Sequence, residues 1–125
     1  MTARSISDVA AATGVTAHTL RYYERAELLD PIEKNESGWR RFTERDLARI
    51  EFIGRLRATG MPIRDIRRYV DLIRSGEHTE PDRIALLEEH RLLVEQQLED
   101  VGRSLDAINS KIDNYRAKRA GSKDE

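Results

Sequence analysis

The carboxyl-terminal third of the sequence carries an apolar repeat that limits what the chain can fold into. Residues 79–82 combine a capping threonine, a proline and acids, which favours the start of a helix. From there, ten positions follow one another at alternating steps of three and four residues, and nine of them are apolar. They are Ile84, Leu87, Arg91, Val94, Leu98, Val101, Leu105, Ile108, Ile112 and Tyr115. A 3.5-residue period sustained this long is typical of a coiled-coil seam.

Such a seam needs a second helix to cover it. No earlier segment has a matching length, so we expect the partner helix to come from another copy of the chain, and a homodimer is the simplest closed arrangement. Residues 82–116 would form a dimerisation helix of about 50 Å at a rise of 1.5 Å per residue. Residues 117–125 are small or charged, and we expect a disordered tail there.

Arg91 interrupts the apolar seam, and two interpretations are open. In the first, its long stem lies along the seam while the guanidinium reaches water near one end of the coil. In the second, the arginine fixes one alignment of the two helices, for example by pairing with a carboxylate of the partner helix.

The amino-terminal residues predict two short helices joined by a tight turn. Ser7 is a candidate N-cap for the first helix, which Gly14 ends, and Thr16 can cap a second helix over residues 17–25. This spacing is typical of a helix-turn-helix. Apolar and small residues at steps of three and four supply its inward face: Ile6, Val9, Ala10, Val15, Thr19, Leu20 and Tyr23.

A hairpin and two further helices complete the predicted first domain. Residues 28–32 and 39–42 are β-compatible runs around a polar, glycine-containing turn, which makes them a candidate wing. A third helix is predicted over residues 44–59, and a fourth follows residues 61–63 and stops at a Ser-Gly pair. We therefore expect a domain over residues 1–75 and a linker over 76–81.

Composition excludes several classes of protein and supports none strongly. The absence of cysteine removes disulfides, thiolate metal sites and thiol sensing. The residues His18, His78 and His90 are not spaced as a metal site, and a weak site formed by His78 and His90 across a dimer is the alternative. No phosphate-binding loop or nucleophile motif is present, so we expect neither an enzyme nor a cofactor. No apolar run is long enough for a membrane span or signal peptide, which indicates a cytoplasmic protein. The net charge of −1 means that the chain lacks the overall excess of basic residues that is usual in nucleic-acid-binding domains.

Local motifs are more informative than composition. The run Leu20–Glu24 (LRYYE) is followed by a Leu-Leu pair and Pro31, then by the wing sequence SGWRRF and the run TERDL at residues 43–47. Together these motifs resemble the MerR family of bacterial transcription regulators along the whole chain. The resemblance implies a mainly α fold, with a winged helix-turn-helix DNA-binding domain and a long dimerisation helix that forms an antiparallel coiled coil.

The same resemblance implies which residues face DNA. The second helix would enter the major groove with Thr16, His18 and Arg21 nearest the bases, and with Tyr22 and Arg25 toward the phosphates. The side-chain chemistry suits these roles, because arginine pairs with guanine edges or phosphates and a tyrosine hydroxyl can donate to a phosphate oxygen. The alternative is an ordinary solvated helix face.

Paired arginines follow the glycine of the hairpin. Arg40 and Arg41 are candidates to bind phosphates or a narrow minor groove. The alternative is that they only place charge on a strand edge and so discourage pairing with strands of other molecules. Trp39 belongs either to the core of the wing or to a contact at the DNA surface, and we favour partial packing in the wing.

The expected function is sequence-specific transcription regulation by a homodimer. The resemblance implies that it binds promoter DNA between the polymerase recognition elements, distorts it, and so acts on RNA polymerase indirectly; deforming such a site costs of order 1–6 kcal/mol. One rival is an architectural or recombination-accessory protein that bends DNA. Another is a coiled-coil adaptor with a degenerate DNA-binding domain, which would lack the steep salt dependence of a true DNA binder.

Overall fold

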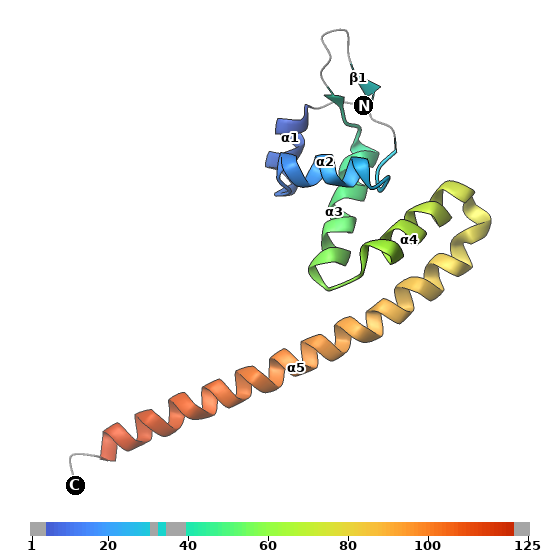
Figure 1. Ribbon diagram of the computed structural model, residues 1–125. Helices are drawn as coiled ribbons and strands as arrows, with labels where there is room; N and C mark the ends of the chain where they lie inside the picture. Colours follow the sequence, from blue (N-terminus) through green and yellow to red (C-terminus); the bar gives the residue numbers. More distant parts are fainter. Residues whose placement is uncertain (1–4, 31–32, 35–39, 122–125) are drawn as a thin grey trace. The chain divides into compact units, whose positions relative to one another are not determined.

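The computed structural model describes residues 5–30, 33–34 and 40–121, with side chains over 5–30 and 42–121. Contacts divide the chain into two compact units, Met1–Leu86 and Leu87–Glu125. In chain order (Figure 1), the elements are α1 (Ile6–Thr13), α2 (Ala17–Arg25), β1 (Glu33–Lys34), β2 (Arg40–Arg41), α3 (Glu44–Ala58), α4 (Ile63–Ser75), the 3₁₀ helix η1 (Glu77–Thr79) and α5 (Glu80–Gly121).

The first helix begins earlier than predicted. Its N-cap is Ser5 rather than Ser7, because Asp8 lies at the position from which a carboxylate can reach back to the cap. The Ser5 hydroxyl accepts from the amide of Asp8 at 3.2 Å, and the Asp8 carboxylate accepts from the amide of Ser5 at 3.4 Å. A helix capped by Ser7 would have alanine at the corresponding position. Gly14 ends α1 with φ 74°, as the sequence predicts.

The core of the first unit is apolar and draws on α1, α2, α3, α4 and the loop after α2. Its buried apolar side chains are Val9, Leu20, Tyr23, Leu28, Leu29, Phe42, Leu47, Ile50, Ile53, Leu56, Met61, Ile66 and Val70. Val9, Leu20 and Tyr23 are inward positions predicted from helical periodicity, because one face of each short helix must leave water for the unit to fold. The other four predicted positions, Ile6, Ala10, Val15 and Thr19, are partly buried.

Within the described residues, the first wing strand lies after the β-compatible run predicted for it at residues 28–32. In the described part of the hairpin, Glu33 lies opposite Arg41 and Lys34 lies opposite Arg40. Leu28 and Leu29 are buried from an irregular loop instead of a strand. The amide of Leu28 donates to the carbonyl of Tyr23 at 2.9 Å, so this segment closes the end of α2 and cannot extend the hairpin. Residues 31–32 and 35–39, including Trp39, lie outside the described residues.

The segment predicted as a linker, residues 76–81, is ordered by its own hydrogen bonds. It contains η1 and the first turn of α5. The buried hydroxyl of Thr79 donates to the carbonyl of Gly76 at 2.7 Å and also contacts that of Leu72. Arg83 donates to the Thr79 hydroxyl at 3.0 Å and to the Gly76 carbonyl at 2.8 Å. These contacts join the end of α4 to the start of α5.

The last helix is longer than expected at both ends. It begins at Glu80 and continues to Gly121, so residues 117–121, predicted to be disordered, are helical. Alanine, lysine and arginine are strong helix formers, and Lys118 and Arg119 suit the negative end of the helix dipole. No residue of α5 is buried in the single chain. Within the described residues, no helix is both long and apolar enough to cross a membrane.

Candidate nucleic-acid interface

The helix α2 has one buried and one exposed face. Leu20 and Tyr23 are only 1% and 2% exposed, so they anchor the helix to the core. His18, Arg21 and Arg25 are exposed on the remaining surface. A rigid, anchored helix with basic residues on its free face is the arrangement that enters the major groove in helix-turn-helix proteins.

Thr16 acts as the N-cap of α2. Its hydroxyl accepts from the amide of Thr19 at 3.1 Å and lies 3.0 Å from the Thr19 hydroxyl. This cap fixes the start of the helix and satisfies one of its free amides. The predicted base contact of Thr16 therefore falls on a side chain that already has a structural role.

The arginines of the first unit differ in how they are neutralised. Arg49 and Arg74 both lie 3.2 Å from Asp30, and Arg67 lies 3.3 Å from Glu27. Arg21 and Arg25, in contrast, have no acidic partner within the described part of the chain. Unpaired guanidinium groups on an exposed helix face remain free to bind phosphate oxygens or guanine edges.

Tyr22 is half-buried and is held by an arginine that sequence reasoning missed. The guanidinium of Arg57, on α3, lies 5.6 Å from the centre of the Tyr22 ring and 5.7 Å from that of Tyr23. A cation over an aromatic face within about 6 Å is attractive. The pairing therefore connects α2 to the last turn of α3. Nothing in the local sequence around Arg57 signals this contact, because it joins residues far apart in the chain.

The backbone of the wing brings basic residues of both strands together. Arg40 lies opposite Lys34, and Arg41 lies opposite Glu33. Arg40 and Arg41 are thus adjacent on β2, directly before the buried Phe42 that anchors the strand. Their phosphate or minor-groove contacts remain predictions.

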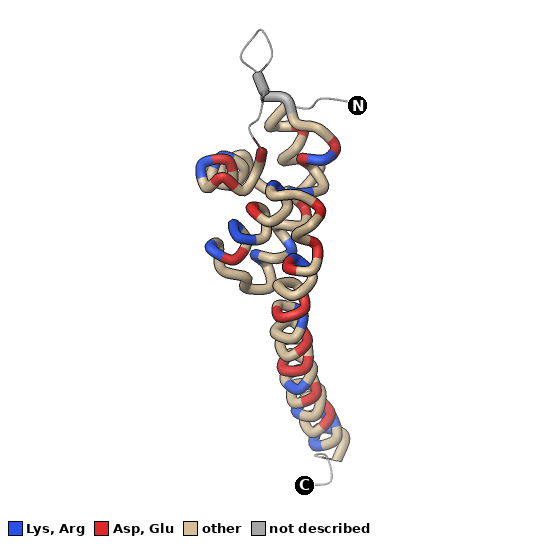
Figure 2. Tube along the Cα trace, turned by 90° about the vertical axis from the view of Figure 1, so that its right-hand side faces the viewer, with Lys and Arg blue, Asp and Glu red and all other residues tan. Residues whose placement is uncertain are grey.

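Acidic and basic residues are interleaved over the helices (Figure 2), in keeping with the small net charge of −1. Within residues 5–30 and 42–121, no group of three or more histidines or carboxylates is placed to hold a metal ion. Among the residues with described side chains, the exposed basic residues of α2 are therefore the features best suited to bind DNA.

Comparison with known proteins assigns the family. Residues 4–73 match the family described as MerR HTH family regulatory protein, and residues 47–111 match the family described as MerR, DNA binding. An HTH-type transcriptional regulator of Haemophilus influenzae is 36% identical over 87% of this chain and 82% of its own length. The regulator ZntR of Escherichia coli is 32% identical over 83% of this chain and 77% of its own length.

Solved structures agree with this assignment. A MerR family transcriptional regulator from Listeria monocytogenes superposes with a TM-score of 0.87 at 37% identity, covering 98% of this chain and 92% of its own. HiNmlR, described as a MerR family regulator lacking the sensor domain and bound to promoter DNA, superposes with a TM-score of 0.83 at 31% identity, covering 94% of each chain. The protein belongs to the MerR family and is a DNA-binding transcription regulator, not an enzyme.

Proposed function

We propose that the protein acts as a homodimer paired through α5, and that its two α2 helices read two half-sites of one promoter. The exposed seam of α5 carries this proposal. Leu98 and Val101 are 73% and 65% exposed in the single chain, and most of the other apolar seam residues are also exposed. A continuous apolar stripe along an otherwise polar helix favours association with a second helix.

The charges of α5 favour antiparallel pairing. Of the residues next to the seam, Glu88 and Glu95 in the first half are acidic, whereas Lys111 and Arg116 in the second half are basic. Parallel helices would place like charges together, and antiparallel helices would place each acidic half against the basic half of the partner. Charges flanking a seam select the orientation of a coiled coil in this way.

The antiparallel arrangement would let one dimer bind one duplex through two DNA-binding domains. Because the second contact is intramolecular once the first has formed, a dimer gains on the order of 10²–10⁴ in affinity over a single domain. In the cytoplasm, a dimer that binds one promoter at two places would bend or untwist the DNA between the polymerase recognition elements. RNA polymerase would then respond to the altered promoter rather than to the regulator directly. The relative HiNmlR, which is bound to promoter DNA, supports promoter binding by this chain.

Three measurements on the full chain test the proposal. Sedimentation should give a dimer at micromolar concentration. Fluorophores attached to a cysteine introduced at Ala120 should be far apart in an antiparallel dimer and close together in a parallel one. A duplex selected by the protein from a random library should bind tightly and weaken steeply as salt rises. A monomer without affinity for any duplex would refute the proposal.

Substituting Arg91 with leucine should stabilise the dimer. Within the described residues, Arg91 makes one ion pair, an exposed one with Glu88 at 3.5 Å, and such pairs contribute little to stability. A leucine at this position would extend the apolar seam, so the melting temperature should rise by roughly 2–8 °C. The control is Arg103→Leu, outside the seam, which loses its pairs with Glu99 and Asp100 and gains no burial. Formation of higher oligomers by Arg91→Leu would instead show that Arg91 fixes the alignment.

A further inference from the structure

Three arginines from α3 and α4 hold the turn that follows α2. The turn comprises residues 27–30 and leads from α2 toward the wing. Arg49 reaches Asp30 from α3, while Arg67 and Arg74 reach the turn from α4. These contacts join residues 19 to 47 positions apart in the sequence.

Arg74 makes the most extensive of these contacts. Its Nη1 donates to the carbonyl of Glu27 at 2.8 Å, and its Nη2 donates to the carbonyl of Leu29 at 2.7 Å. Its Nε donates to the Asp30 carboxylate at 3.2 Å. All three guanidinium nitrogens are therefore directed at a single turn. Lysine cannot make these three contacts together, because its ammonium group is a compact charge and lacks the planar set of donors of a guanidinium.

The turn held by Arg74 has an uncommon backbone. Glu27 has a φ of 62°, the only positive value at a non-glycine position in the described residues. This conformation is unfavourable for most side chains and persists where surrounding contacts impose it. The bond from Arg74 to the Glu27 carbonyl and the pair between Arg67 and Glu27 are such contacts.

The turn lies between the two elements expected to touch DNA. It begins two residues after the end of α2 and ends three residues before β1, so the chain passes through it on the way from one element to the other. Arg74 itself lies in the last turn of α4, directly before the segment that Thr79 and Arg83 bond to the start of α5.

We propose that Arg74 is a positioning residue for DNA binding: it holds α2 and the wing in the relative orientation that reads a specific sequence. The inference rests on the proposed function, because it requires that the protein recognise particular DNA. Arg74 does not need to touch DNA in this role. It acts through the turn at residues 27–30.

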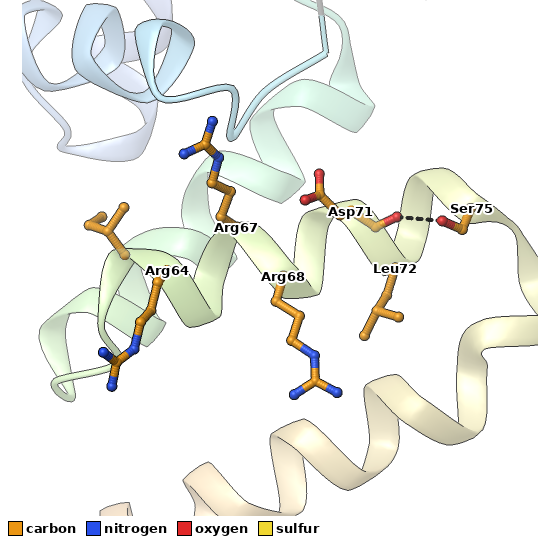
Figure 3. A pocket seen from close by; sticks show the side chains of 7 residues that line it. Arg64, Arg67, Arg68, Asp71, Leu72 and Ser75 are labelled. Atoms are coloured by element: carbon orange, nitrogen blue, oxygen red, sulfur yellow. Dashed lines mark hydrogen bonds between the residues drawn. The ribbon is translucent and has the colours of Figure 1, made fainter.

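The helix α4 offers a matched control. Arg67 and Arg68 extend from opposite sides of α4 (Figure 3), along a surface depression of about 410 Å³ lined by Arg64, Asp71 and Leu72 among others. Arg68 is exposed and makes no ion pair or side-chain hydrogen bond within the described residues. Arg68→Lys and Arg68→Ala therefore repeat the chemical change at Arg74 without disturbing the turn.

The test compares Arg74→Lys and Arg74→Ala with the matched Arg68 variants and the wild type. The probes are a duplex of about 30 base pairs selected by the wild type from a random library and a shuffled duplex of the same composition. Fluorescence anisotropy gives both affinities, at a temperature where circular dichroism shows the wild type, Arg74→Lys and the Arg68 variants to be fully folded. Arg74→Lys keeps the charge and should fold even if Arg74→Ala does not.

We expect Arg74→Lys to lower affinity for the selected duplex by about tenfold or more while leaving the shuffled duplex and the salt dependence nearly unchanged. A residue that only stabilises the fold would lower the melting temperature without changing this ratio. Wild-type binding of the selected duplex by Arg74→Lys, or an equal loss on both duplexes, would overturn the inference. Failure of the wild type to select any duplex would instead refute the proposed function.

Discussion

Substituting Leu98 with glutamate should convert the dimer to monomers and remove tight operator binding. Leu98 lies near the middle of the seam and is 73% exposed in the single chain, so it has no other packing role. Each dimer would contain two substituted positions, and each would lose the burial of a leucine and place a carboxylate against an apolar partner. Losses of about 2–5 kcal/mol per site raise the dissociation constant by at least about 1000-fold.

Two measurements test the prediction for Leu98→Glu. Sedimentation should show a monomer at concentrations where the wild type is dimeric, and affinity for the selected duplex should fall by about 10²–10⁴ through the loss of bivalent binding. Ser110→Glu is the matched control, because Ser110 lies on the far side of the helix from Ile108 and Ile112 and receives the same charge. A dimeric Leu98→Glu protein would contradict the assigned seam, and monomers from both variants would mean that charge alone disrupts pairing.

Features that depend on neighbours within one turn could be predicted from the sequence. The Thr16 cap, the capping box formed by Thr43 and Asp46, and the stop at Gly14 each involve residues no more than four positions apart. The long helix was predictable for the same reason, since its repeat is regular over its whole length. Its carboxyl end was placed too early because composition suggested disorder, whereas the helix propensity of residues 117–120 extends it.

Features that depend on tertiary packing were not predictable in the same way. Leu28 and Leu29 are β-compatible, but their burial from a loop depends on how the chain leaves α2. The exposed face of α2 followed from its periodicity. The contacts of Arg57 with Tyr22 and of Arg74 with the turn at residues 27–30 did not, because only the packed fold brings these residues together.

Substituting Arg21 with alanine should weaken binding to the selected duplex and relax its base preference. Arg21 is exposed in the middle of α2 and has no acidic partner within the described residues, so its guanidinium is available for a base edge. A bidentate contact with guanine is worth about 1–3 kcal/mol, and a dimer would lose two of them. Affinity should therefore fall by about 30-fold to 10⁴-fold, while affinity for shuffled DNA falls far less.

Arg41→Ala provides the contrast, because Arg41 is predicted to contact the DNA backbone. Its loss should weaken binding to selected and shuffled duplexes almost equally. The slope of log affinity against log salt concentration should become less steep by about one for each subunit. Competition between the two duplexes at two salt concentrations separates the roles. Equal effects of the variants on both duplexes would show that Arg21 contacts only phosphate, and a loss of base preference in Arg41→Ala alone would assign sequence reading to the wing instead of α2.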